Sequence, residues 1–302
     1  MTSAGRTSRA ARARAAFVHL PLAVAFAVGV AAVPGGATSG RPASGDAAQA
    51  GAAAQQGANP RSVAAGADTP AAATRWAVGE FLEYTLKYGA LSVGSGRMQV
   101  LGRQAIRGRD TWQLQFDFSG GTLFFRVNDA FVSWLDVRTL NSLRFEQRIS
   151  EPGYKRNRVY EIFPDRSVFT LKGGEDKPSV ADPLDDATFF YFIRTIPLDV
   201  GKSYDFYRYF DPKANPVTIR VLRRDTVSVP AGTFPAIVIQ PLIKTSGIFS
   251  EGGQAELWLS DDDRRILLQM KSKLSFGSLN LYLRKYVLPP LTPNGPTLTS
   301  PP

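Results

Sequence analysis

The chain has 302 residues, contains no cysteine and one histidine, His19, and carries a formal net charge of +10 at pH 7. The absence of cysteine excludes disulfides, thiolate metal sites and a lipid-modified N-terminal cysteine. Because His19 lies in a segment that we expect to be removed, the mature protein would lack the imidazole of Ser-His-Asp and Cys-His sites, and a zinc, copper or haem site is disfavoured. We therefore expect no cofactor and no metal, and the composition favours a protein that is not an enzyme.

Half of the positive charge comes from residues 1–75, which hold seven arginines and two aspartates. The rest is spread along the chain, whereas nucleic-acid-binding proteins usually cluster basic residues on one face together with base-stacking aromatic residues. We therefore expect a solvated surface and no nucleic-acid partner.

The N-terminus has the layout of a secretory signal peptide, with four arginines at positions 6–14 followed by an apolar run over residues 17–33. We expect residues 1–33 to direct export to the periplasm or cell envelope and then to be cleaved, which leaves no membrane span and no lipid anchor. The alternative is an uncleaved anchor, but the run holds only 17 residues, including His19 and Pro21, and lies at the short limit for a spanning helix.

Residues 34–75 are rich in alanine, glycine, serine and proline and contain no aromatic residue. Such a segment cannot bury enough apolar surface to fold, so we expect a disordered linker. Residues 289–302 form a proline-rich tail, for which we also expect disorder. Residues 76–288 remain as a single β-rich domain, and a domain of this size can build a core without disulfides.

Short strands separated by polar turns dominate this domain. Residues 79–88 and 111–119 alternate apolar and polar positions, and in the second stretch Trp112, Phe116 and Phe118 share one face, as in a half-buried strand. Further strands are predicted at residues 97–101, 124–127, 130–137, 143–149, 158–163, 167–171, 204–210, 217–222, 226–229, 234–243, 255–260, 266–274 and 279–287. Because no helix of crossover length separates the strands before residue 172, we expect antiparallel neighbours.

One helix is predicted after Asp182, which can cap it, with Pro183 at the first helical position. Apolar residues then recur at helical spacing until Pro197, namely Phe189, Phe192, Ile193 and Ile196. The predicted fold class is mainly β: a curved antiparallel sheet, or partly open β-barrel, with one main α-helix packed on or in it.

Residues 225–241 carry a strong hairpin signal. Pro230 presets a turn and Gly232 adopts a positive φ without steric cost, while β-branched residues flank both. Asp225 is the one residue of this stretch that is suited to acid–base or metal chemistry, so the pattern indicates structure.

The order of these features resembles the bacterial exported family named domain of unknown function 3108. The resemblance runs from about residue 76 to residue 287. Its pieces are Gly79-Glu80-Phe81-Leu82, Asp185-Asp186 before an aromatic helix, Val229-Pro230-Ala231-Gly232-Thr233-Phe234, and Trp258-Leu259-Ser260 followed by three aspartates. It implies a β-rich envelope domain similar in shape to the lipoprotein-carrier folds of the periplasm, which are open, curved antiparallel sheets with a helix in the concavity. The family has no established activity, so no functional residue is carried over.

The aromatic content suggests a ligand site. The residues expected to line a cavity for an acyl chain or another apolar ligand are Trp112, Phe116, Phe118, Phe189, Phe192, Ile193 and Ile196. The same residues would serve equally well as a filled core, because inward strand positions are normally packed.

Two groups of aspartates invite a metal or acid–base hypothesis. Asp182, Asp185 and Asp186 fall at a helix start, where capping and the helix dipole favour carboxylates. Residues 261–263 lack the ligand spacing of a calcium loop, and aspartates are common in turns. We therefore expect a structural role for both groups.

The sequence thus favours a non-enzymatic exported envelope protein that binds a lipid-like or apolar ligand. The alternative is an interaction module with a filled core whose sheet binds an envelope protein partner. A third hypothesis is a glycan hydrolase that uses two carboxylates, although no pair is distinguished by the sequence. An outer-membrane barrel is disfavoured by the short strands and by arginines in mid-strand positions.

Overall fold

In a computed structural model of the chain, the structure describes residues 74–122, 125–151, 153–243, 254–274 and 277–291. The predicted signal peptide, most of the linker and most of the tail lie outside these ranges. The strands are β1 (Phe81–Tyr88), β2 (Leu91–Ile106), β3 (Arg109–Thr122), β4 (Phe125–Asp136), β5 (Ser142–Glu151), β6 (Tyr154–Phe163), β7 (Val168–Leu171), β8 (Asp176–Pro178), β9 (Ser203–Phe206), β10 (Val217–Val229), β11 (Gly232–Ile243), β12 (Gln254–Ser260), β13 (Leu267–Leu274) and β14 (Gly277–Val287). The α-helix among the described residues is α2 (Asp186–Phe192).

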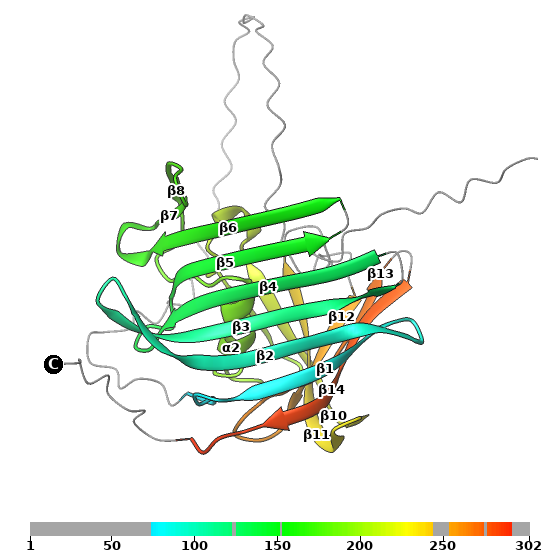
Figure 1. The fold of residues 1–302 in the computed structure, drawn as a ribbon. Helices are drawn as coiled ribbons and strands as arrows, with labels where there is room; N and C mark the ends of the chain where they lie inside the picture. The colour runs from blue at the N-terminus through cyan, green and yellow to red at the C-terminus, as the bar shows by residue number, and fades with distance from the viewer. Residues whose placement is uncertain (1–73, 123–124, 152, 244–253, 275–276, 292–302) are drawn as a thin grey trace, which may run out of the picture.

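These strands form one 14-stranded sheet with the order β8-β7-β6-β5-β4-β3-β2-β1-β14-β13-β12-β11-β10-β9. Strands that follow one another in each half are antiparallel neighbours, and the halves join where β1 pairs with β14, with Phe81 opposite Val287. The edges are β8 and β9, so the sheet is not closed. The sheet curls around α2, which lies on its concave side (Figure 1). The predicted fold class is therefore confirmed.

The core follows from the alternation of side chains along the strands. Leu82, Tyr84 and Leu86 of β1 are buried, and the intervening residues of that strand are half-buried. These buried positions face the concave side, where they meet α2 and the opposite wall of the barrel. A smaller cluster, formed by Ile106, Val132, Trp134 and Leu143, lies on the convex side of β2, β4 and β5. Most apolar burial is thus inside the curve of the sheet.

The helix differs from its prediction at both ends. Asp185, and not Asp182, is the N-cap residue: its side chain accepts hydrogen bonds from the backbone N–H groups of Ala187 and Thr188. The helix ends at Phe192, so the predicted apolar positions 193 and 196 lie after it. All of residues 187–192 are buried, which is typical of a helix surrounded by a sheet.

Several predicted strands are parts of longer ones. Residues 124–127 and 130–137 fall on the single strand β4, because Asn128 and Asp129 keep their places in the ladder opposite Ser119 and Phe118. Residues 217–222 and 226–229 fall on β10, which continues through a register shift between Val221 and Arg223. Such a shift bends the strand without ending it. The strand predicted at residues 204–210 is shorter and ends at Phe206.

The predicted hairpin is confirmed. β10 and β11 pair from Val217 opposite Ile243 to Val229 opposite Gly232, and Pro230 and Ala231 make the turn between them. Gly232 has a φ of 140°, a conformation that side-chain-bearing residues avoid.

No helix in the described ranges combines the length and the apolar character that a bilayer-spanning segment requires.

Candidate functional site

The seven predicted lining residues are all buried on the concave side. Trp112, Phe116 and Phe118 are successive inward positions of β3, and the remaining four lie on α2 or just after it. All seven belong to one hydrophobic core. Phe116 and Phe118 are neighbours, with ring centroids 5.8 Å apart, but Phe192 packs 5.1 Å from Phe206 of β9.

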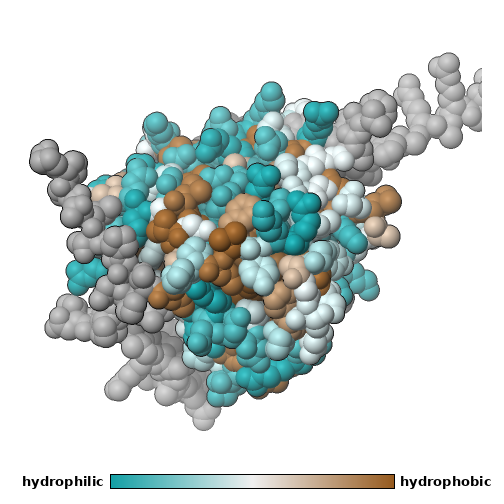
Figure 2. All heavy atoms as spheres, turned by 60° about the horizontal axis from the view of Figure 1, so that its bottom comes forward, coloured by the Kyte–Doolittle hydropathy of each residue, from teal (hydrophilic) through white to brown (hydrophobic). Residues whose placement is uncertain are grey.

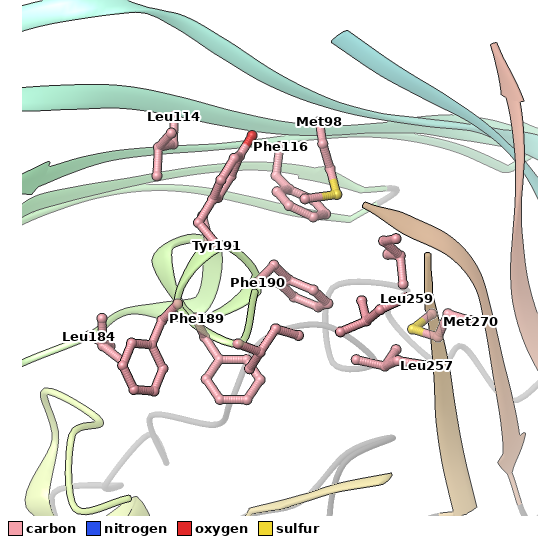
Figure 3. Close-up of a cluster of buried hydrophobic side chains, with 14 of the residues drawn as sticks. Met98, Leu114, Phe116, Leu184, Phe189, Phe190, Tyr191, Leu257, Leu259 and Met270 are labelled. Carbon is pink, nitrogen blue, oxygen red and sulfur yellow. The ribbon is translucent and has the colours of Figure 1, made fainter. Parts of the chain in front are cut away.

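Phe190 provides the contact between α2 and the centre of β3. Its ring centroid lies 5.0 Å from that of Phe116. Figure 3 shows Phe190 between the two walls of the barrel, with Phe116 on one side and Leu257 on the other. The helical stripe in the sequence did not include Phe190, because a helix buried on all sides uses every position for packing.

Aromatic side chains form a row across the concave face of β3–β6, which we call the aromatic row. Its members are Phe118, Phe131, Phe145 and Tyr160. Successive ring centroids are 6.3, 6.3 and 6.0 Å apart, and the last two pairs are stacked with interplanar angles of 18°. The row exists because Phe145 lies directly opposite Tyr160 in the ladder, so their side chains share a face.

Three polar residues, which we call the polar group, share this face beside the aromatic row. Gln147 of β5 lies between Phe131 of β4 and Arg158 of β6, and Arg156 lies opposite the next inward residue, Ile149. Gln147 is 4% exposed, whereas the two arginines are half-buried. The sequence patterns did not single out these residues, and their position on the concave face follows from the pairing of β6 with β5.

The contacts of this polar group are incomplete. The amide nitrogen of Gln147 donates to a carboxylate oxygen of Asp186 at 3.4 Å, and the other oxygen of Asp186 accepts from Tyr209 at 2.9 Å. Among the described residues, the Oε1 atom of Gln147 has no hydrogen-bond partner, although it is buried. The Nε atom of Arg156 is in the same situation. Arg158 donates to the hydroxyl of Tyr160 at 3.1 Å.

The tyrosines near this group are held in their neutral form. Burial raises the pKa of Tyr160, against the opposing effects of Arg158 and Arg156. Burial, reinforced by the negative charge of Asp186, raises the pKa of Tyr209 well above its ordinary value. Both hydroxyls therefore stay protonated at neutral pH and act as neutral hydrogen-bonding groups.

The opposite end of the barrel, where β1 begins, is closed by a buried ion pair. Arg194, just after α2, donates from Nη1 and Nη2 to the two carboxylate oxygens of Glu80 at 2.6 and 3.0 Å. Its remaining donors reach the carbonyl oxygens of Arg264 at 2.8 Å and Arg75 at 2.7 Å. Burial acts to lower the pKa of Arg194, but the charge and hydrogen bonding of Glu80, together with the nearby Tyr191 and Tyr84, outweigh burial and raise that pKa. The ion pair thus ties the segment after α2 to the residue that precedes β1.

The N-terminus of α2 is fixed to the sheet by a second buried network. Asp185 accepts a hydrogen bond from the hydroxyl of Ser133 on β4 at 2.7 Å, and the hydroxyls of Ser142 and Thr188 lie 2.8 Å apart. Burial raises the pKa of Asp185, against the hydrogen bonds that it accepts. All of these groups serve to position the helix.

The aspartate groups show structural contacts. The Oδ1 atom of Asp262 accepts from the backbone N–H groups of Arg264 and Arg265, which makes the 261–263 stretch a turn. No group of three or more potential metal ligands occurs in the part of the chain that the structure describes.

Comparison with known proteins gives a family and distant structural neighbours. A beta-barrel-like protein of the DUF1849 family from Brucella abortus is 11% identical, with a TM-score of 0.48 over 72% of this chain and 100% of that chain. A candidate lipoprotein from Parabacteroides distasonis is 12% identical, with a TM-score of 0.33 over 71% and 99%. A candidate exported protein with a YmcC-like fold from Bacteroides fragilis is 12% identical, with a TM-score of 0.28 over 70% and 97%.

None of these TM-scores reaches about 0.5, so the neighbours carry no argument about function, and among curated proteins none matches the sequence. The family described as protein of unknown function DUF3108 matches residues 83–284, from within β1 to within β14. This match spans both halves of the sheet together with α2, and the chain therefore belongs to the DUF3108 family of proteins of unknown function.

Proposed function

We propose that this protein is a non-enzymatic, exported cell-envelope protein that binds a lipid-like ligand on the concave face of its sheet. The observation that carries the proposal is the aromatic row, which lies inside the curve of the sheet with a polar group at one side. Ligand sites commonly combine an apolar lining with a few convergent polar groups. We further propose that the protein acts in the periplasm or envelope without a lipid anchor, since the chain begins with a signal-like segment and has no cysteine.

The small size of the helix supports this proposal. α2 has 7 residues and is about 10 Å long, whereas β3 has 14 residues and spans about 45 Å. The helix therefore covers only part of the concave face. Beyond the helix, the inward side chain of Phe118 is 3% exposed and packs against Phe116 and Phe131, so a ligand chain would have to displace some of the side chains that cover it.

Photo-crosslinking tests this proposal. The probe is a long-chain fatty acid that carries a diazirine in its chain, added to the full-length exported protein, and adducts are mapped by mass spectrometry. We expect adducts on Phe131 and Phe145 of the aromatic row. Val132 and Glu146, their neighbours on the convex face, provide internal controls because consecutive strand residues point to opposite faces.

Adducts spread equally over the two faces would indicate adsorption to the surface and would contradict the proposal. Native mass spectrometry of protein taken from the cell envelope supplies a second measurement. We expect a co-purified molecule of lipid mass.

A second candidate function, docking of an envelope protein, is favoured by exposed apolar residues at the junction of the two halves. Val78, Tyr286, Val287 and Leu291 are between 38% and 49% exposed and lie where β1 begins or β14 ends. Figure 2 shows apolar atoms gathered among polar ones on the underside of the molecule. A photoreactive side chain introduced in place of Val287 should form a discrete crosslinked adduct with an envelope protein in cells. The same group at Val200, which is similarly exposed, should give none.

A further inference from the structure

We propose that Arg156 and Arg158 of β6, together with Gln147 of β5, bind the anionic head group of an amphiphile whose chain lies along the aromatic row. This inference rests on the proposed function and names the chemical class of the ligand. The three residues are adjacent, since Gln147 lies opposite Arg158, and Arg156 is the preceding inward residue of β6.

The two arginines differ from Arg109 and Arg144, which are also half-buried. Arg109 has a carboxylate partner in Asp136 at 2.7 Å, and Arg144 has one in Glu161 at 2.6 Å. Among the carboxylates whose side chains the structure describes, none lies within 4.0 Å of Arg156 or Arg158. A half-buried charge without a partner is costly, so an anion placed between the two guanidinium groups would be stabilised.

The hydrogen-bonding atoms of these three residues match a ligand that has an anionic group and a hydrogen-bond donor next to it. The buried Nε of Arg156 needs an acceptor, and its guanidinium otherwise lies over the ring of Tyr154 at 5.5 Å. Arg158 uses one N–H for Tyr160 and keeps others available. The buried Oε1 of Gln147 needs a donor. A phosphate monoester or a carboxylate with an adjacent hydroxyl offers both kinds of atom, and arginine binds such groups in a bidentate manner.

Two described carboxylates lie near this site. Asp129, opposite Phe118 on the concave face, accepts a hydrogen bond from the backbone N–H of Ser150 at 3.0 Å. Asp186 lies on the far side of Gln147 and would repel an anion. Its two oxygens, however, accept from Gln147 and Tyr209, and burial together with this carboxylate keeps the Tyr209 hydroxyl protonated. The position of Gln147 between Asp186 and Arg158 therefore separates the carboxylate from the proposed anion.

Burial along β6 gives the orientation of the ligand. Tyr154 is exposed, Arg156 and Arg158 are half-buried, and Tyr160 and Ile162 are buried. These five residues share the concave face, so the strand runs from solvent into the core. An amphiphile would place its head group at the arginines and direct its chain toward Tyr160 and Phe145, which pack against Phe210 and would surround the chain with apolar contacts.

Calorimetric titration of the full-length exported protein with decyl phosphate, decanol and inorganic phosphate tests this inference. We expect decyl phosphate to bind at least about tenfold more tightly than decanol, because hydrogen bonds to charged groups contribute that much or more. Inorganic phosphate should bind more weakly than decyl phosphate, since it lacks the chain. These three comparisons use the unaltered protein and do not depend on the folding of any variant.

The variant R156Q/R158Q should lose about tenfold or more in affinity for decyl phosphate and should keep its affinity for decanol. The control variant R148Q/K155Q removes two positive charges from exposed positions on the opposite face of the same two strands and should bind decyl phosphate as the wild type does.

Each alternative result has a distinct meaning. Equal binding of decyl phosphate and decanol, or equal losses in the two variants, would overturn the head-group assignment and leave the proposed function intact. Binding of inorganic phosphate as tight as that of decyl phosphate would replace the amphiphile by free phosphate. Failure of both decyl compounds to bind would overturn the proposed function itself.

Discussion

Substitution of Glu80 by glutamine should strongly destabilise the fold. The side chains of Glu80 and Arg194 are 0% and 1% exposed. They form a bidentate ion pair in which Nη1 and Nη2 of Arg194 lie 2.6 and 3.0 Å from the two carboxylate oxygens of Glu80. In E80Q the guanidinium stays buried with two backbone carbonyls and a neutral amide as its partners. Removing one partner of a buried pair typically costs about 3–5 kcal/mol, a large share of the roughly 5–15 kcal/mol that stabilises a domain.

Glu256 offers a matched control. It forms a similar bidentate ion pair with Arg223, whose Nη2 and Nη1 atoms lie 2.8 and 3.3 Å from the carboxylate oxygens. The side chains of Glu256 and Arg223 are, however, 32% and 45% exposed. Because water screens this pair, E256Q should cost less than about 1 kcal/mol. Replacing both members of the buried pair with apolar residues, as in E80L/R194M, should recover much of the loss, since no buried charge then remains unpaired.

Urea unfolding followed by circular dichroism measures these differences in the free energy of unfolding. For a domain of this size, each kcal/mol corresponds to about 2–4 °C in the melting temperature, so thermal unfolding provides an independent check. If E80Q and E256Q differ by less than about 1 kcal/mol, the Glu80–Arg194 pair does not hold the closed end of the barrel in the way proposed.

Two further predictions concern the helix cap and the strand spacing. Burial raises the pKa of Asp185 above its ordinary value, so its ionised form destabilises the folded state. D185N keeps the capping oxygen and should therefore gain stability over the wild type as the pH rises from about 4 toward neutrality, which unfolding curves across that range would detect. A Cβ at Gly94 would lie 2.3 Å from the carbonyl oxygen of Ser119, whereas one at Gly102 would meet no atom within 4 Å. G94A should cost about 1–3 kcal/mol or more and G102A should stay within about 0.5 kcal/mol, and equal unfolding free energies would contradict this close-approach argument.

Local patterns predicted the strands because side-chain alternation is a property of the extended backbone itself. Trp112, Phe116 and Phe118 are buried on one face, as their spacing indicated. The start of the helix was misplaced because Asp182 and Asp185 are both suitable caps by residue type. Asp185 is selected by a partner that lies 52 positions away, the hydroxyl of Ser133.

The candidate site was only partly predictable for a similar reason. The aromatic residues of β3 were correctly assigned to the inward face, but alternation alone does not tell which other strands face them. Arg156 and Arg158 read as ordinary strand-surface charges. Their concave position follows from the pairing of β6 with β5, which places Arg158 beside the buried Gln147.

The sequence by itself determined the β-rich class, the hairpin around Pro230 and Gly232, and the absence of cysteine chemistry, because these depend on composition and on local backbone preference. Only the tertiary structure decided that β1 pairs with β14, that Glu80 meets Arg194, and that two arginines lie inside the curve of the sheet. These features depend on which distant segments become neighbours and on the direction in which the sheet curls. Neither is encoded by the period of a single strand.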